Sequence, residues 1–169
     1  MATVFYLSSA VALVAAALAI GRRNPFHGLL YVVVSLLAVA VVFFSLGAPF
    51  AAALEIIVYA GAIIVLFVFV VMMLNLRSSE NRPAYALQSP TMWVGPGALA
   101  LVLLIELAVV LVTGGAATNA DGAVGPKEVS VALFGSYALG VELASFLLLA
   151  GLVGAAYLGA GVRTTGGEE

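Results

Sequence analysis

The chain has 169 residues, of which 64% are hydrophobic and only 8% are charged, whereas soluble domains contain about 25% charged residues. This composition excludes an ordinary soluble domain and indicates an integral membrane protein. The net charge of −2 and the lack of nucleic-acid motifs argue against nucleic acid as a partner. The chain has no cysteine and a single histidine, so an iron–sulfur cluster or disulfide cannot be built from it, and a haem or zinc site is not expected.

Five apolar runs are long enough to cross a bilayer, which takes about 20 helical residues. They are predicted over residues 3–20, 28–46, 52–76, 94–112 and 131–162. Because only short connections separate them, we expect an all-α membrane protein in which residues 1–169 form one bundle of five transmembrane helices. The first run lacks a preceding basic segment and a cleavage pattern, so we expect a retained span rather than a signal peptide.

The connections between these runs differ in length and composition. Pro25 lies in the first turn and can begin the second helix, and the short link at residues 47–49 makes spans two and three an antiparallel hairpin. Small and polar residues predict a flexible loop over 113–130. The fifth run is long enough to begin with a short interfacial segment near residues 133–137, and residues 163–169 form a polar tail.

The basic residues predict the orientation of the chain in the membrane. With five spans, one side holds five arginines and the other holds only Lys127. The arginines are Arg22, Arg23, Arg77, Arg82 and Arg163. Because basic residues accumulate on the cytoplasmic side, we expect a periplasmic N-terminus, a periplasmic 113–130 loop and a cytoplasmic C-terminal tail.

Three glutamates lie inside predicted spans: Glu55 in the third, Glu106 in the fourth and Glu142 in the fifth. A charged side chain at the bilayer centre costs roughly 2.5–3.5 kcal/mol on insertion scales, so these groups are candidates for proton carriers. Each also has a structural interpretation. Glu55 could cap its helix or reach lipid headgroups, and Glu106 could hydrogen-bond to a neighbouring helix as a neutral acid. Glu142, near Tyr137 and Ser145, could be structural too.

The third predicted span combines polar groups with a glycine. Glu55 and Tyr59 are four residues apart, so on an α-helix they share a face and the phenol can donate to the carboxylate. Gly61 weakens the helix locally and permits close helix packing. Packing is the structural alternative for Gly61, but π-bulges concentrate at functional sites, and we expect one here.

Several stretches resemble a known family. The most specific is Leu54-Glu-Ile-Ile-Val-Tyr-Ala-Gly61, continuing to residue 75, and further similar stretches lie at 24–31, 43–47, 93–96 and 133–154. They resemble subunit J of proton-pumping NADH:quinone oxidoreductase, respiratory complex I, which is the bacterial counterpart of mitochondrial chain 6. The resemblance covers nearly the whole chain, except the loop at 114–128 and the C-terminal tail.

This resemblance implies a noncatalytic subunit in the membrane arm of a proton-translocating enzyme of the bacterial inner membrane. The chain would carry no redox centre, no metal and no cofactor, while other subunits hold FMN, iron–sulfur clusters and quinone such as ubiquinone. Its expected partners are the other membrane subunits, especially a small three-helix subunit and the quinone-site subunit, together with the lipid bilayer.

The resemblance also implies a mechanism. The third helix of the family is expected to convert between bulged and regular α-helical forms as quinone reacts, which opens or closes a water path toward carboxylates of the small subunit. The polar edge of the path would be Glu55 and Tyr59, and the hinge would be Gly61. The bulky residues that rotate would be Val65, Phe67 and Met72. Glu142 is a weaker candidate for the proton path than these residues, and Glu106 is the weakest.

Two other functions are compatible with the sequence. One is an accessory subunit of a multisubunit cation/proton antiporter, whose membrane parts are related to complex I. The other is a scaffold in which the buried glutamates only hydrogen-bond to neighbouring helices, and in which Phe67 and Met72 only fill space.

Overall fold

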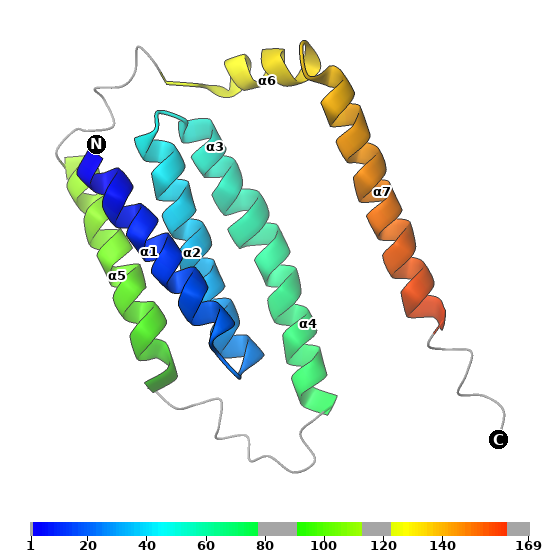
Figure 1. The fold of residues 1–169 in the computed structure, drawn as a ribbon, viewed down its shortest axis with the longest axis horizontal. Helices are drawn as coiled ribbons and strands as arrows, with labels where there is room; N and C mark the ends of the chain where they lie inside the picture. Colours follow the sequence, from blue (N-terminus) through cyan, green and yellow to red (C-terminus); the bar gives the residue numbers. More distant parts are fainter. Residues whose placement is uncertain (1, 78–90, 113–122, 162–169) are drawn as a thin grey trace. The chain divides into compact units, whose positions relative to one another are not determined.

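The computed structural model describes residues 2–77, 91–112 and 123–161 (Figure 1). The helices are α1 (Ala2–Ile20), α2 (Pro25–Ser45), α3 (Pro49–Leu54), η1 (Glu55–Ile63), α4 (Ile64–Arg77), α5 (Thr91–Val112), α6 (Pro126–Phe134) and α7 (Ala138–Gly161). In the described part of the chain, five helical segments are long and apolar enough to cross a membrane. They are Ala2–Ile20, Pro25–Ser45, Pro49–Met73, Trp93–Val110 and Ala138–Gly159. The prediction of an all-helical chain with five candidate spans is therefore confirmed.

Two compact units make up the chain, Met1–Val124 and Gly125–Glu169. In the first unit, α2 is the central helix, because it contacts α1, α5 and every segment of the third helix, which runs through α3, η1 and α4. Figure 1 shows this third helix on one side of α2, with α1 and α5 on the other.

Small side chains bring α1 and α2 close together. Ala15 and Ala38 are completely buried and share a core with Val11, Val34 and Leu103. Ser35 of α2 donates a hydrogen bond from its Oγ to the Ala12 carbonyl of α1 over 3.0 Å. Small residues and such polar contacts are the usual means by which helices associate in a membrane, so this pair holds the unit together.

Two prolines begin helices, and for Pro25 this confirms the prediction that it can start the second helix. Pro25 is the first residue of α2, and the Asn24 Oδ1 accepts a hydrogen bond from the Phe26 N–H at 3.0 Å. Pro49 is the first residue of α3 and follows a turn at Gly47, whose φ of 80° suits glycine. The Gly47 carbonyl also accepts a hydrogen bond from the Val124 N–H at 2.9 Å, which brings residues 123–124 to this turn.

The second unit corrects the predicted loop and fifth span. Residues 126–130 are not loop but the start of α6, because Pro126 occupies the first position and the Glu128 carboxylate accepts a hydrogen bond from the Gly125 N–H at 3.1 Å. α6 ends at Phe134, and its C-cap is Gly135, where a Cβ would lie 2.6 Å from the Val131 carbonyl oxygen. The predicted span 131–162 is therefore two helices. Residues 113–122 of the predicted loop and the 163–169 tail lie outside the described residues.

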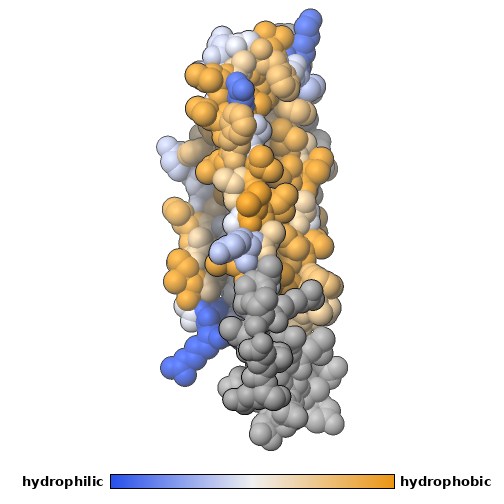
Figure 2. Space-filling view, turned by 90° about the vertical axis from the view of Figure 1, so that its right-hand side faces the viewer, coloured by the Kyte–Doolittle hydropathy of each residue, from blue (hydrophilic) through white to orange (hydrophobic). Residues whose placement is uncertain are grey.

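The surface of the described residues is mostly apolar. Figure 2 shows a face on which hydrophobic side chains predominate, and large apolar side chains are exposed on every candidate span except the central one, Pro25–Ser45. A contiguous apolar surface of this kind is covered by lipid or by other membrane proteins.

Candidate functional site

A π-helical segment interrupts the third helix. The nine residues of η1, Glu55–Ile63, lie between α3 and α4 without a break in the helix. The N–H of Ile64 donates to the Tyr59 carbonyl, five residues earlier, which is the hydrogen-bond pattern of a π-helix. π-Helices are rare and are frequently found at functional sites, so this segment is the candidate site of the chain.

Gly61 lies in η1 at a position where a side chain would be crowded by the backbone. A Cβ at this position would lie 3.2 Å from the Ile56 carbonyl oxygen, which is tighter than an ordinary van der Waals contact. The crowded carbonyl lies five residues before Gly61, so the contact belongs to the wide π turn. A side chain at position 61 would therefore require the Ile56 carbonyl to shift by a few tenths of an ångström.

Glu55 is the first residue of η1 and is buried, with 9% of its surface exposed. It does not cap the helix, because the helix begins at Pro49 and its N-cap, Ala48, makes no side-chain capping bond. Among the described residues, no group hydrogen-bonds to the Glu55 carboxyl. The carboxyl is thus free to bind a proton, a water molecule or a group from a neighbouring protein.

Tyr59 does not pair with Glu55 as the sequence predicts. The tyrosine is 50% exposed whereas Glu55 is buried, and within the described part of the chain no hydrogen bond joins their side chains. The prediction assumed α-helical spacing, in which residues four apart are stacked. In η1 the turn is wider, so the side chain four residues on no longer returns to the same direction.

The three predicted gating side chains lie on α4 and point away from the core of this chain. Val65 is 62% exposed, Phe67 is 55% exposed and Met72 is 51% exposed. Only Ile64 is buried among the described side chains of α4. The face that holds the three residues is therefore available to a neighbouring protein or to lipid.

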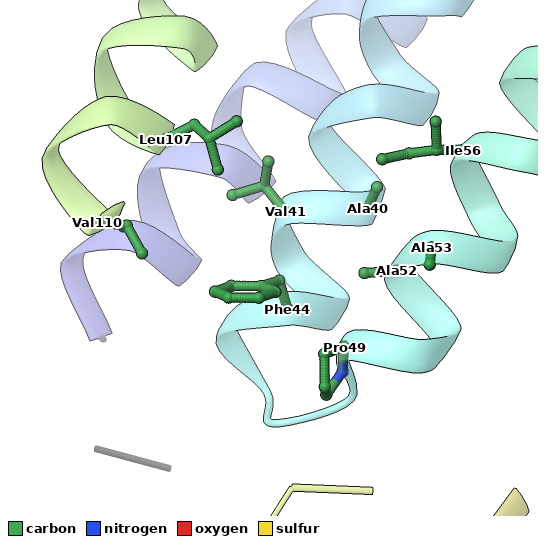
Figure 3. A pocket seen from close by; sticks show the side chains of 9 residues that line it. All are labelled: Ala40, Val41, Phe44, Pro49, Ala52, Ala53, Ile56, Leu107 and Val110. Carbon is green, nitrogen blue, oxygen red and sulfur yellow. The ribbon is translucent and has the colours of Figure 1, made fainter. Parts of the chain in front are cut away.

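An apolar cavity of about 250 Å³ lies beside the π segment, between α2, the third helix and α5 (Figure 3). Ile56 projects into it from η1, and Ala52 and Ala53 line it from α3. The remaining lining residues are also apolar: Ala40, Val41, Phe44, Pro49, Leu107 and Val110. The cavity provides room for side chains of η1 to move.

Glu106 lies at the contact of α1 and α5. It is 6% exposed, and its Oε1 accepts a hydrogen bond from the Ser8 Oγ at 2.9 Å. This contact matches the structural interpretation, a hydrogen bond to a neighbouring helix. The sequence analysis missed Ser8, although Ser8, Ala12 and Ala15 form a stripe of small residues that indicates a packed face of α1.

Glu142 lies in α7, in the second unit. Ser145 donates a hydrogen bond to the Glu142 backbone carbonyl at 2.7 Å and not to its carboxyl. The predicted structural partner therefore does not bind the side chain. The described residues contain no group of three histidine, cysteine, aspartate or glutamate side chains that could hold a metal ion.

Comparison with known proteins identifies the family. Residues 15–158 match the family described as NADH-ubiquinone/plastoquinone oxidoreductase chain 6. The chain belongs to this family. The part of this chain that matches the family includes all three segments of the third helix and most of α7. The π segment therefore lies within the matched part.

Individual members of the family align with this chain over almost its full length. The NADH-quinone oxidoreductase subunit J of Pseudomonas aeruginosa is 56% identical over 156 residues, which are 92% of this chain and 94% of that protein. The subunit J of Escherichia coli K12 is 51% identical over 92% of this chain and 84% of that protein. The subunit J of Buchnera aphidicola from Schizaphis graminum is 42% identical over 94% of this chain and 98% of that protein.

Proposed function

We propose that this chain is a noncatalytic membrane subunit of bacterial NADH:quinone oxidoreductase, complex I, and that its third helix couples quinone reduction to proton translocation. The observation that carries the proposal is a π-helix at Glu55–Ile63 in a member of the chain 6 family. In this account electrons pass through FMN, iron–sulfur clusters and quinone on other subunits, and the chain acts as a gate in the inner membrane.

The gate works through a change in helix register. Conversion of the π segment to an α-helix shifts the helical register by one residue. The part of the helix that follows the segment then rotates by about 100° around the helix axis. The exposed side chains Val65, Phe67 and Met72 lie beyond η1 on α4, so they change the direction in which they face a neighbour. Their rotation opens or closes a water path next to the third helix.

The surroundings of η1 support such a change. Ile56 already projects into the apolar cavity of about 250 Å³, so its movement displaces no packed side chain. Gly61 allows both forms because it has no Cβ to crowd the Ile56 carbonyl. Packed helices switch between discrete arrangements, and η1 has both the weak point and the space to do so.

Glu55 and Tyr59 form the polar edge of the path. The buried Glu55 carboxyl exchanges protons with water on the path, and the half-exposed Tyr59 hydroxyl orients that water rather than bonding to Glu55 directly. The path continues toward carboxylates of a small neighbouring subunit. The N-terminus of the chain is periplasmic in this proposal and the turn with Arg22 and Arg23 is cytoplasmic.

Purification of the chain from native membranes tests the proposed assembly. We expect a tagged chain to co-purify with flavin, iron–sulfur clusters and NADH-dependent quinone reduction, because complex I holds all three. Absorbance and electron paramagnetic resonance spectra of the purified material measure the flavin and the clusters. Recovery of an ion-exchanging membrane complex without flavin or clusters would favour the antiporter and contradict the proposal.

A further inference from the structure

The pair Glu106–Ser8 is a buried polar site on the side of α2 away from the third helix. Ser8 is completely buried and donates its only hydroxyl proton to the Glu106 Oε1 at 2.9 Å. The other carboxyl oxygen, Oε2, is buried and has no hydrogen-bond partner among the described residues. One serine therefore satisfies half of a carboxyl group that is 6% exposed.

No cation in this unit's described residues compensates a charge on Glu106. The helices packed against α5 are α1 and α2, and their ionisable side chains are Tyr6, which is 71% exposed, His27 and Tyr31. Tyr31 packs against Gly95, where a Cβ would collide with the hydroxyl, and this contact lies roughly 16 Å along α5 from Glu106.

Arg22, in the turn between α1 and α2, is held at that same distant end. Arg22 donates a hydrogen bond to the Tyr31 hydroxyl at 3.1 Å, and its guanidinium lies 5.0 Å from the centre of the Tyr31 ring. The ring of His27 lies 5.3 Å from the same tyrosine ring. These groups contact one another and leave Glu106 with only a serine as partner.

We infer that Glu106 is a second proton-binding site of this chain, in which Ser8 holds Oε1 of the neutral acid and Oε2 bears the proton. An ionised carboxylate here would be a buried, unpaired charge, which is far more costly than a neutral acid with one hydrogen bond. The site does not depend on the register of η1, because it is made only by α1 and α5.

An apolar groove also runs beside this site. A groove of about 340 Å³ between α1 and α5 includes Glu106 in its wall beside Val4, Leu7, Ile105 and Val109. A dialkylcarbodiimide reacts with such an acid in balanced steps. The acid proton moves to a carbodiimide nitrogen and the carboxyl oxygen bonds to the central carbon. The acyl group then migrates to nitrogen, which gives a stable N-acylurea without a leaving group.

Infrared difference spectroscopy of the assembled complex tests the proton-binding site. At neutral pH the wild-type minus Glu106→Gln spectrum is expected to show the carbonyl stretch of a protonated acid. In Ser8→Ala this band is expected to move to higher frequency, because Oε1 loses its hydrogen bond. Ser8→Ala keeps the carboxyl in place, so it remains informative if Glu106→Gln assembles poorly. Carboxylate bands in place of the carbonyl band, or a band that Ser8→Ala leaves unmoved, would overturn the inference.

Chemical modification of the same preparation tests the groove. After treatment with dicyclohexylcarbodiimide, we expect mass spectrometry to locate an adduct of the whole reagent on the α5 peptide that contains Glu106. A charged, water-soluble carbodiimide serves as the control and is expected to leave this peptide unmodified. If the peptide stays unmodified after treatment with dicyclohexylcarbodiimide, the reagent does not reach Glu106 through the α1–α5 groove, and this part of the inference is wrong.

Discussion

Replacing Gly61 with valine is expected to lower proton translocation by roughly tenfold in fully assembled complex. A Cβ at this position lies 3.2 Å from the Ile56 carbonyl oxygen, and overpacking of this kind costs typically 1–3 kcal/mol. We expect this free-energy cost to fall on the π-helical form of η1. The equilibrium between the π-helical and α-helical forms then shifts toward the α-helix by about 5–150-fold. Protons pumped per NADH oxidised in inverted membrane vesicles measure the effect.

Gly97→Val is the matched control for this experiment. Gly97 also lies in a membrane helix, but a Cβ there meets no atom within 4 Å. We expect this variant to assemble and pump like the wild type. If Gly61→Val assembles to the normal level and pumps normally as well, the register of η1 has no part in coupling and the chain acts as a scaffold.

Substituting Glu55 with glutamine is expected to reduce pumping by about tenfold or more, which is a modest loss for the removal of a proton-transferring group. Glutamine keeps the shape of the side chain in its buried place at the start of η1 but cannot exchange a proton. Quinone reduction and pumping are measured together. NADH oxidation by an artificial acceptor that bypasses quinone is expected to be unchanged.

Two variants complete the Glu55 experiment. Glu55→Asp restores the carboxylic acid and is expected to recover part of the pumping. Glu128→Gln alters a glutamate in α6 that caps Gly125 outside the candidate spans, and we expect it to pump normally. Equal pumping by Glu55→Gln and the wild type would remove Glu55 from the path.

Hydropathy predicts the five candidate spans because a membrane requires long apolar helices, and the structure confirms them. The boundaries are less predictable. The loop at 113–130 was assigned from its composition, but α6 starts at Pro126 because the Glu128 side chain caps Gly125. Composition alone does not reveal such a local hydrogen bond.

The candidate site is only partly predictable for a physical reason. The pairing of Glu55 with Tyr59 was derived from the α-helical period, whereas both residues lie in η1, which has the π period. The contact between Ser8 and Glu106 joins residues far apart in sequence, and no single-helix pattern specifies it. Sequence identified the region with weak helical propensity, but the direction of each side chain depends on the helix type and on packing.

Accessibility of single cysteines on α4 during turnover tests the register change most directly, because the natural chain contains no cysteine. Leu66→Cys and Val68→Cys place thiols at an exposed and a half-buried position, and Leu101→Cys is an exposed control on α5. We expect NADH and quinone together to change the labelling rates at 66 and 68 in opposite directions, with no change at 101. Unchanged rates at both positions in a pumping complex would contradict a rotating third helix.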